Sequence, residues 1–135
     1  MVESFEGLEV WQIGKNIVME IYQLTAYLPK EEAFVLTPQI RRAALSVPAN
    51  IAEGFGRYHY LDKAKFYLNA RGSLYELKSH LLIAQELGYL NQSQPVSTSL
   101  NESQPITSLL IAIDKLGVKL NNLISSSRKL SKASQ

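Results

Sequence analysis

Residue types that commonly carry catalysis or metal binding are few in this sequence. Cysteine is absent, which excludes disulfides, thiolate metal sites and thiol nucleophiles. The two histidines, His59 and His80, are 21 positions apart and do not share a helix face. Glu76 and His80 are spaced by four, whereas a di-metal bundle needs Glu-x-x-His pairs on facing helices. We therefore expect no metal site and no cofactor.

Short motifs also argue against an enzyme. The stretch Gly54-Phe55-Gly56 lacks the Gly-Lys-Ser/Thr ending and the preceding strand of a phosphate loop, so we interpret it as a helix end. Serine is abundant, yet no Gly-x-Ser-x-Gly elbow occurs and neither histidine is an evident base. A small-molecule enzyme would need a perturbed carboxylate in a polar pocket, and Glu53 is the one candidate. We therefore predict a protein without catalytic activity.

One polar set stands out in the predicted second helix: Ser46, Asn50, Glu53 and Arg57. Their spacings of four, three and four place them on one face, where Glu53 and Arg57 can form an ion pair. Asn50 is a poor helix former, so it needs a hydrogen-bonding reason to be there. The set indicates either a buried network that sets helix or subunit register, or a contact to a ligand or RNA.

A second set interleaves cations with tyrosines on the predicted third helix, within an arc of roughly 120°: Tyr60, Lys63, Tyr67, Arg71, Tyr75 and Lys78. Cations suit phosphates, and tyrosine rings stack on unpaired bases. An ordinary solvated face with snorkelling stems gives the same pattern. With neighbouring basic residues, the candidate nucleic-acid contacts are Arg41, Arg42, Arg57, Lys63, Tyr67, Arg71 and Lys78.

Apolar residues that recur at three and four predict four helices, at about residues 7–27, 38–56, 60–87 and 105–128. The predicted fold is all-α, one antiparallel up-down four-helix bundle. In the second helix, Thr37 would cap the amides, Pro38 would begin the helix and Pro48 would kink it. We expect a polar linker over 92–104 and a frayed tail over 129–135.

Two helices carry predictions of their own. The core face of the third would be Phe66, Ala70, Ser73, Leu77, Leu81 and Ala84. The first carries a second apolar strip beside its core strip, which suggests packing against something further. The candidate oligomer contacts on that strip are Trp11, Val18 and Tyr22.

Length and charge bound the class of protein. The 135 residues suit one domain, and 46% hydrophobic residues suffice for a core. Residues 1–37 hold two Lys/Arg against six glutamates, whereas residues 38–85 hold seven Lys/Arg against three Asp/Glu. This asymmetry either steers an anion or pairs helices. With no apolar run of bilayer length and an acidic start, we expect a cytoplasmic protein without membrane contact.

Several of these stretches resemble the family of four-helix bundle proteins encoded in intervening sequences of bacterial 23S ribosomal RNA genes. The resemblance covers about residues 5–91, and residues 116–124 resemble the last helix of the family. The matching stretches are Leu8–Trp11, Leu36–Ala44, Ser46–Arg57 and Ala70–Leu77. The Ser/Gln-rich linker is longer than the family pattern.

The resemblance implies an up-down bundle that assembles into a ring, commonly a homopentamer. A similar group, the accessory proteins of diversity-generating retroelements, uses a basic pentameric barrel to bind nucleic acid and reverse transcriptase. No catalytic residue carries over. Two hypotheses follow: an oligomeric bundle that binds RNA or a nucleoprotein through its basic residues, and a protein-interaction scaffold with no nucleic-acid role.

Overall fold

The computed structural model describes residues 2–90 and 105–134. Its four helices are α1 (Glu9–Thr25), α2 (Leu36–Phe55), α3 (Tyr60–Glu86) and α4 (Pro105–Ala133), and the short 3-10 turns η1 (Phe5–Gly7) and η2 (Lys30–Glu32) precede α1 and α2. The described residues contain no strand, so the predicted all-α four-helix bundle is confirmed. The predicted linker over 92–104 lies outside the described residues.

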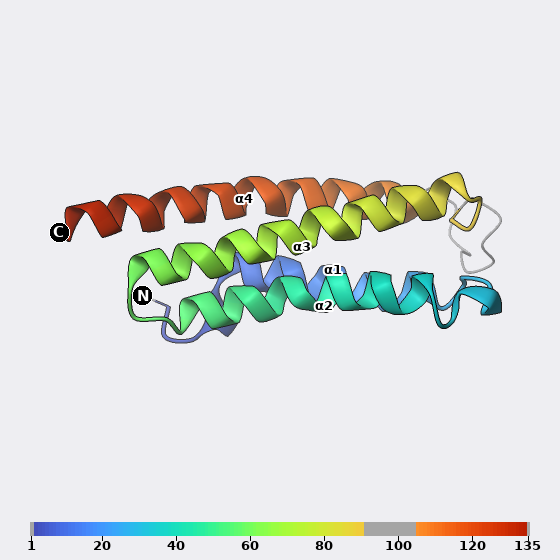
Figure 1. The fold of residues 1–135 in the computed structure, drawn as a ribbon, viewed down its shortest axis with the longest axis horizontal. Helices are drawn as coiled ribbons and strands as arrows, with labels where there is room; N and C mark the ends of the chain where they lie inside the picture. Colours follow the sequence, from blue (N-terminus) through green and yellow to red (C-terminus); the bar gives the residue numbers. More distant parts are fainter. Residues whose placement is uncertain (1, 91–104, 135) are drawn as a thin grey trace.

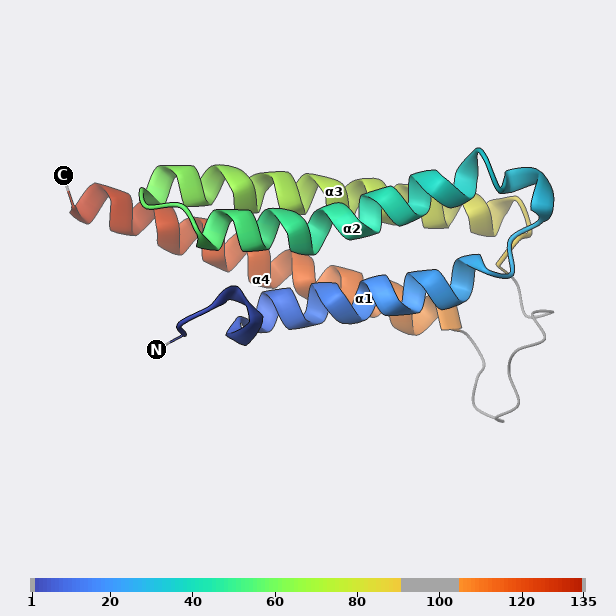
Figure 2. The same ribbon diagram turned by 90° about the horizontal axis from the view of Figure 1, so that it is seen from below.

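The helices lie along one long axis, and Figures 1 and 2 show successive helices running in opposite directions. Each helix contacts the next and α1 also contacts α4, so the four enclose one core. The outer side of the α1–α2 pair is therefore opposite that of the α3–α4 pair. The N-terminal segment, the α2–α3 loop and the end of α4 all lie at one end of the bundle.

Each helix contributes one apolar strip to the core, as the repeat of three and four residues predicts. The largest fully buried side chains are Ile17, Ile21, Ile40, Val47, Ile51, Leu74, Leu77, Leu81, Leu109, Ile113, Leu116 and Leu120. Burying a side chain of this size contributes about 1.5–3 kcal/mol relative to leaving it exposed. All four helices supply members of this set, so the core holds the whole bundle together.

The core face of α3 is confirmed in its second half and turned in its first half. Ala70, Leu77, Leu81 and Ala84 are buried as expected, but Tyr67 and Leu74 replace the predicted Phe66 and Ser73 as core residues. Since α3 carries apolar residues on more than one face, periodicity alone left its rotation undetermined. Packing between α2 and α4 decides that rotation, and it turns Phe66 and Ser73 to half-buried positions.

Two predicted helix boundaries need correction. Helix α2 begins at Leu36 with Val35 as its N-cap, so Thr37 is not the cap and Pro38 is not the first helical residue; both lie inside the helix. The Leu36 amide instead donates to the Glu32 carboxylate. Helix α4 continues to Ala133, so the tail predicted as frayed is helical from residue 129 to 133. No glycine or proline interrupts this stretch, and Lys132 in the last turn suits the helix dipole.

Pro48 lies within α2, which remains helical on both sides of it. A Cβ placed on Gly14 of α1 would lie 3.6 Å from the Cβ of Pro48, so the two helices pack closely at this point. The kink expected at Pro48 stays a prediction.

Candidate nucleic-acid interface

The basic residues predicted to form one surface lie on three different sides of the bundle. Arg41 lies between α1 and α2. Its Nε donates to Thr25 Oγ1 at 2.8 Å, and its guanidinium lies 4.5 Å from the centroid of the Tyr22 ring. A predicted nucleic-acid contact thus lies beside Tyr22, a predicted oligomer contact.

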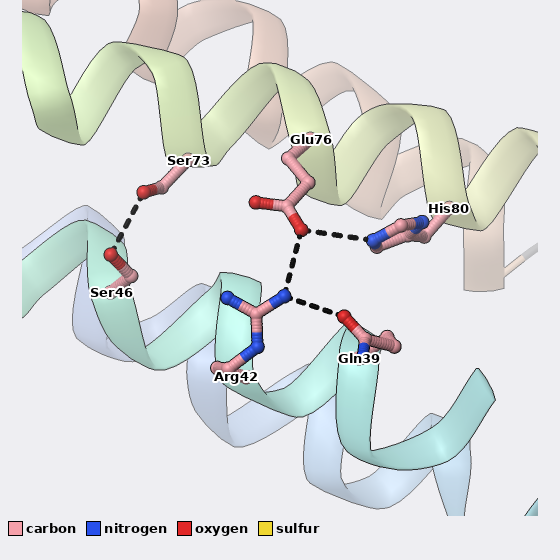
Figure 3. Close-up of polar contacts among 6 residues, drawn as sticks. All are labelled: Gln39, Arg42, Ser46, Ser73, Glu76 and His80. Carbon is pink, nitrogen blue, oxygen red and sulfur yellow. Dashed lines mark hydrogen bonds and ion pairs between the residues drawn. The ribbon is translucent and has the colours of Figure 1, made fainter. Parts of the chain in front are cut away.

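Arg42 lies on another side, at the seam of α2 and α3 shown in Figure 3. Its Nη2 donates to Glu76 Oε2 at 3.1 Å and also to Gln39. The same carboxylate oxygen lies 3.2 Å from His80 Nε2. Because Glu76 neutralises Arg42, this seam supports the α2–α3 contact rather than presenting an unpaired cation.

Arg71 and Lys78 lie on a third side, facing α4. Arg71 Nη1 donates to Asn121 Oδ1 at 2.7 Å, and Lys78 Nζ donates to Asp114 Oδ1 at 2.8 Å. Tyr67, predicted to stack on a base, is only 3% exposed and belongs to the core. The prediction for Tyr67 is wrong, and one protomer does not gather the predicted basic residues into a single patch.

The polar set of α2 divides into two parts. Ser46 Oγ lies 2.8 Å from Ser73 Oγ across the seam (Figure 3), and the Asn50 amide donates to both the carbonyl and the hydroxyl of Ser46. Glu53 and Arg57 form an exposed ion pair at 3.0 Å one turn further along. The half-buried part satisfies the hydrogen bonds of the α2–α3 seam, whereas Arg57 also lines a concave site.

This concave site lies at the end of the bundle where the α2–α3 loop meets the end of α4. We call it the bundle-end hollow. It has a volume of about 680 Å³, within the range of about 300–1,000 Å³ that small-molecule sites occupy. Its lining residues are Arg57, Tyr58, His59, Tyr60, Leu61, Lys63, Ser131 and Ser134.

Two cations of the bundle-end hollow are held by aromatic rings. The Arg57 guanidinium lies 4.5 Å from the Phe66 ring centroid, and Lys63 Nζ lies 5.5 Å from that of Phe55. Lys63 Nζ also donates to the Phe55 carbonyl at 2.8 Å. Burial lowers the pKa of the Lys63 ammonium, because desolvation disfavours its charged form. Arg57 also pairs with Glu53 at 3.0 Å, whereas Lys63 has no carboxylate within ion-pair distance among the described residues. Both cations therefore have defined positions while lining an open surface.

The hollow also presents aromatic rings to solvent. Tyr58 is 88% exposed, and its ring meets that of His59 edge to face with centroids 5.0 Å apart. The residues that line the hollow include no carboxylate. Helix α3 begins here, and the side chain of its N-cap, His59, makes no capping hydrogen bond. The positive end of its dipole lies at this end of the bundle, where Asp62 in the first turn of α3 offsets part of it.

Sequence reasoning identified Arg57 and Lys63 but missed Tyr58, His59, Ser131 and Ser134. The signal that could have found Tyr58 and His59 is the run Arg57-Tyr58-His59-Tyr60, which combines a cation with aromatic rings directly after the glycine that ends the helix. The serines could not be found in this way, because their proximity to the loop depends on how far α4 extends.

Other site classes find no support in the described part of the chain. Residues 2–90 and 105–134 contain no group of three or more His, Cys, Asp or Glu side chains that could hold a metal ion. No helix within these ranges is long and apolar enough to cross a bilayer.

Fold and site together define a four-helix bundle protein with a basic, aromatic hollow at one end. The sequence matches the model of the 23S rRNA-intervening sequence protein family over residues 6–112. The chain belongs to this family, as the resemblance implied. No curated protein is significantly similar to it.

Proposed function

We propose that this chain is a non-enzymatic, self-assembling cytoplasmic protein that binds RNA through the bundle-end hollow. The observation that carries the proposal is the meeting of Arg57, Lys63 and the exposed Tyr58 at one concave surface. Cations attract the phosphates of any nucleic acid, whereas stacking on an exposed ring requires an unpaired base. Single-stranded or looped RNA is the ligand that this combination favours.

The other predicted basic residues take a different role in this proposal. Arg42 and Lys78 pair with Glu76 and Asp114 on neighbouring helices, whereas Arg57 pairs with Glu53 only four residues back in the chain. Arg71 is bonded to Asn121. These contacts support helix packing, so the proposed interface is smaller than the sequence suggested. The same contacts are compatible with the alternative of a protein-interaction scaffold. In that case the sides of the bundle that carry these ion pairs would contact other chains, and no nucleic acid would bind.

Fluorescence anisotropy with an RNA hairpin that has an unpaired loop tests the proposal at about 50 and 200 mM salt. We expect Tyr58→Ala to weaken binding about tenfold or more, since stacking contributes about 1–3 kcal/mol per base. Arg57→Gln should reduce the salt slope by about one.

Arg71→Gln is the matched control, because this cation is distant from the hollow and bonds to Asn121. It should bind RNA as the unaltered protein does. Negligible binding by the unaltered protein at both salt concentrations would favour the scaffold. An equal loss in Arg71→Gln and Arg57→Gln would show that the hollow is not the site.

A further inference from the structure

Helices α3 and α4 carry an exposed apolar surface on their shared outer side. On α3, Tyr75 and Leu82 are seven residues apart, and on α4 so are Ile111 and Val118. Seven-residue spacing keeps side chains in a straight strip that suits a neighbouring helix. These four residues, with Asp114 between them, are called the α3/α4 face; Tyr75 is 55%, Ile111 63% and Val118 60% exposed.

The Lys78–Asp114 contact fixes how the two strips align. Because α3 and α4 run in opposite directions (Figure 1), Tyr75 lies level with Val118, and Leu82 with Ile111. Asp114 lies between these two apolar levels, and its side chain is 62% exposed despite the ion pair. The α3/α4 face is therefore an apolar surface with an accessible carboxylate near its centre.

The opposite side of the bundle carries the complementary chemistry. We call it the α1/α2 face, and it consists of Trp11, Lys15, Val18, Tyr22, Arg41 and Leu45. Lys15 lies 5.9 Å from the Trp11 ring centroid, and Arg41 covers Tyr22. Within the described ranges neither cation has a carboxylate within ion-pair distance. This face is apolar and cationic.

Arg41 and Asp114 lie at nearly the same height along the bundle. Arg42, the neighbour of Arg41, contacts Glu76, and Lys78, two residues further along α3, contacts Asp114. Rotation about an axis parallel to the bundle leaves height unchanged. Two copies related by such a rotation, with unlike faces together, would bring Arg41 of one against Asp114 of the other.

We infer that the α1/α2 face of one copy of this chain docks on the α3/α4 face of a second copy. This inference rests on the self-assembly in the proposed function and names its two surfaces. Because the surfaces are unlike, the contact is head-to-tail. Such a contact gives a closed ring where the rotation between successive copies closes, and an open row of copies where it does not. Trp11, Val18 and Tyr22, predicted from sequence as oligomer contacts, then form only one half of the interface.

A charge swap tests the pairing, with mass measured by light scattering after size exclusion and without RNA. Arg41→Glu alone and Asp114→Arg alone should each raise the concentration needed for assembly at least about tenfold, because each places like charges together. The double variant Arg41→Glu/Asp114→Arg restores the opposite pair between copies but removes the partner of Lys78 within the chain, so it should assemble at a clearly lower concentration than either single variant. Failure of the double variant to recover would overturn the inference.

The apolar part of each face provides a second, independent test. Tyr75→Glu and Leu45→Glu should each abolish assembly, yet a mixture should form a 1:1 dimer, since each chain keeps one intact face. If only Tyr75→Glu loses assembly, the α3/α4 face pairs with itself and the inference is wrong. A monomer of 15.1 kDa for the unaltered protein at micromolar concentration would also overturn it.

Leu130→Glu is the matched control, because Leu130 is an exposed leucine of α4 outside both faces. It should assemble normally, and circular dichroism must show the helicity of the unaltered protein for every variant used. Tyr58→Ala should also assemble normally, so loss of RNA binding and loss of assembly are separable outcomes.

Discussion

Gly54, the last residue but one of α2, packs closely against α3. A Cβ at this position would lie 2.7 Å from Cε1 of Tyr67 and 3.1 Å from Cβ of Phe66, so an added methyl group has no room. The helix end predicted at Gly54-Phe55-Gly56 is confirmed, since α2 ends at Phe55 with Gly56 as its C-cap. Gly54 also makes space there for a buried ring. One residue thereby explains why Tyr67 can enter the core.

The Gly54→Ala variant should therefore be destabilised by about 1–3 kcal/mol, the usual cost of overpacking. Gly72→Ala is the control, because a Cβ there meets no atom within 4 Å and the residue lies within a helix. Alanine at position 72 should raise stability by about 0.5–1 kcal/mol. Urea unfolding measures both, and stabilisation by Gly54→Ala would contradict the close packing.

Tyr67 also predicts a dependence of stability on pH. Burial raises the pKa of its phenol, and a hydrogen bond to Glu32 is the main cause that raises the pKa of Tyr89. A pKa raised in the folded state stabilises the fold below the unfolded value of about 10. That stability is lost as pH rises through the folded pKa.

We expect the melting temperature to fall above about pH 10, and less steeply in Tyr67→Phe, which has no phenol to ionise. Tyr58→Phe, at an exposed site, is the control and should follow the unaltered protein. Thermal melts from neutral to alkaline pH measure this, and an equal fall in Tyr67→Phe would exclude Tyr67 as a cause.

At the scale of elements, the α2–α3 seam combines two kinds of contact at adjacent positions. Glu76 joins Arg42 and His80 at the surface (Figure 3), whereas Leu77 is fully buried. Glu76→Gln should cost no more than about 1 kcal/mol, because partly exposed ion pairs contribute little. Leu77→Ala should cost about 2–5 kcal/mol. Urea unfolding compares them, and equal losses would show that the polar seam holds the helices.

We expect the last turn of α4 to contribute more to RNA binding than to the free energy of unfolding. Ser131 and Ser134 line the bundle-end hollow, and Lys132 lies between them. Removing residues 131–135 should change the free energy of unfolding by no more than about 0.5 kcal/mol. RNA binding should weaken and its salt slope should fall by about one. A large loss of thermal stability on truncation would instead assign this turn to the core.

At the scale of the whole molecule, assembly should strengthen RNA binding, because each assembled copy adds one bundle-end hollow. One hollow offers few cations, but several hollows in a ring would bind one long RNA together, and such linkage raises apparent affinity by about 10²–10⁴. Tyr75→Glu should therefore weaken binding of a long RNA far more than binding of a short oligonucleotide. Anisotropy titrations with both lengths measure this, and equal weakening would separate assembly from binding.

The sequence alone determined the bundle, because the repeat of apolar residues at three and four is a property of each helix by itself. It also identified Arg57 and Lys63, whose neighbours in the chain lie beside them in space. Only the tertiary structure decided the rotation of α3, the burial of Tyr67 and the pairing of Arg42 and Lys78 with carboxylates. Each of these depends on which helix packs alongside, and chain spacing does not specify that.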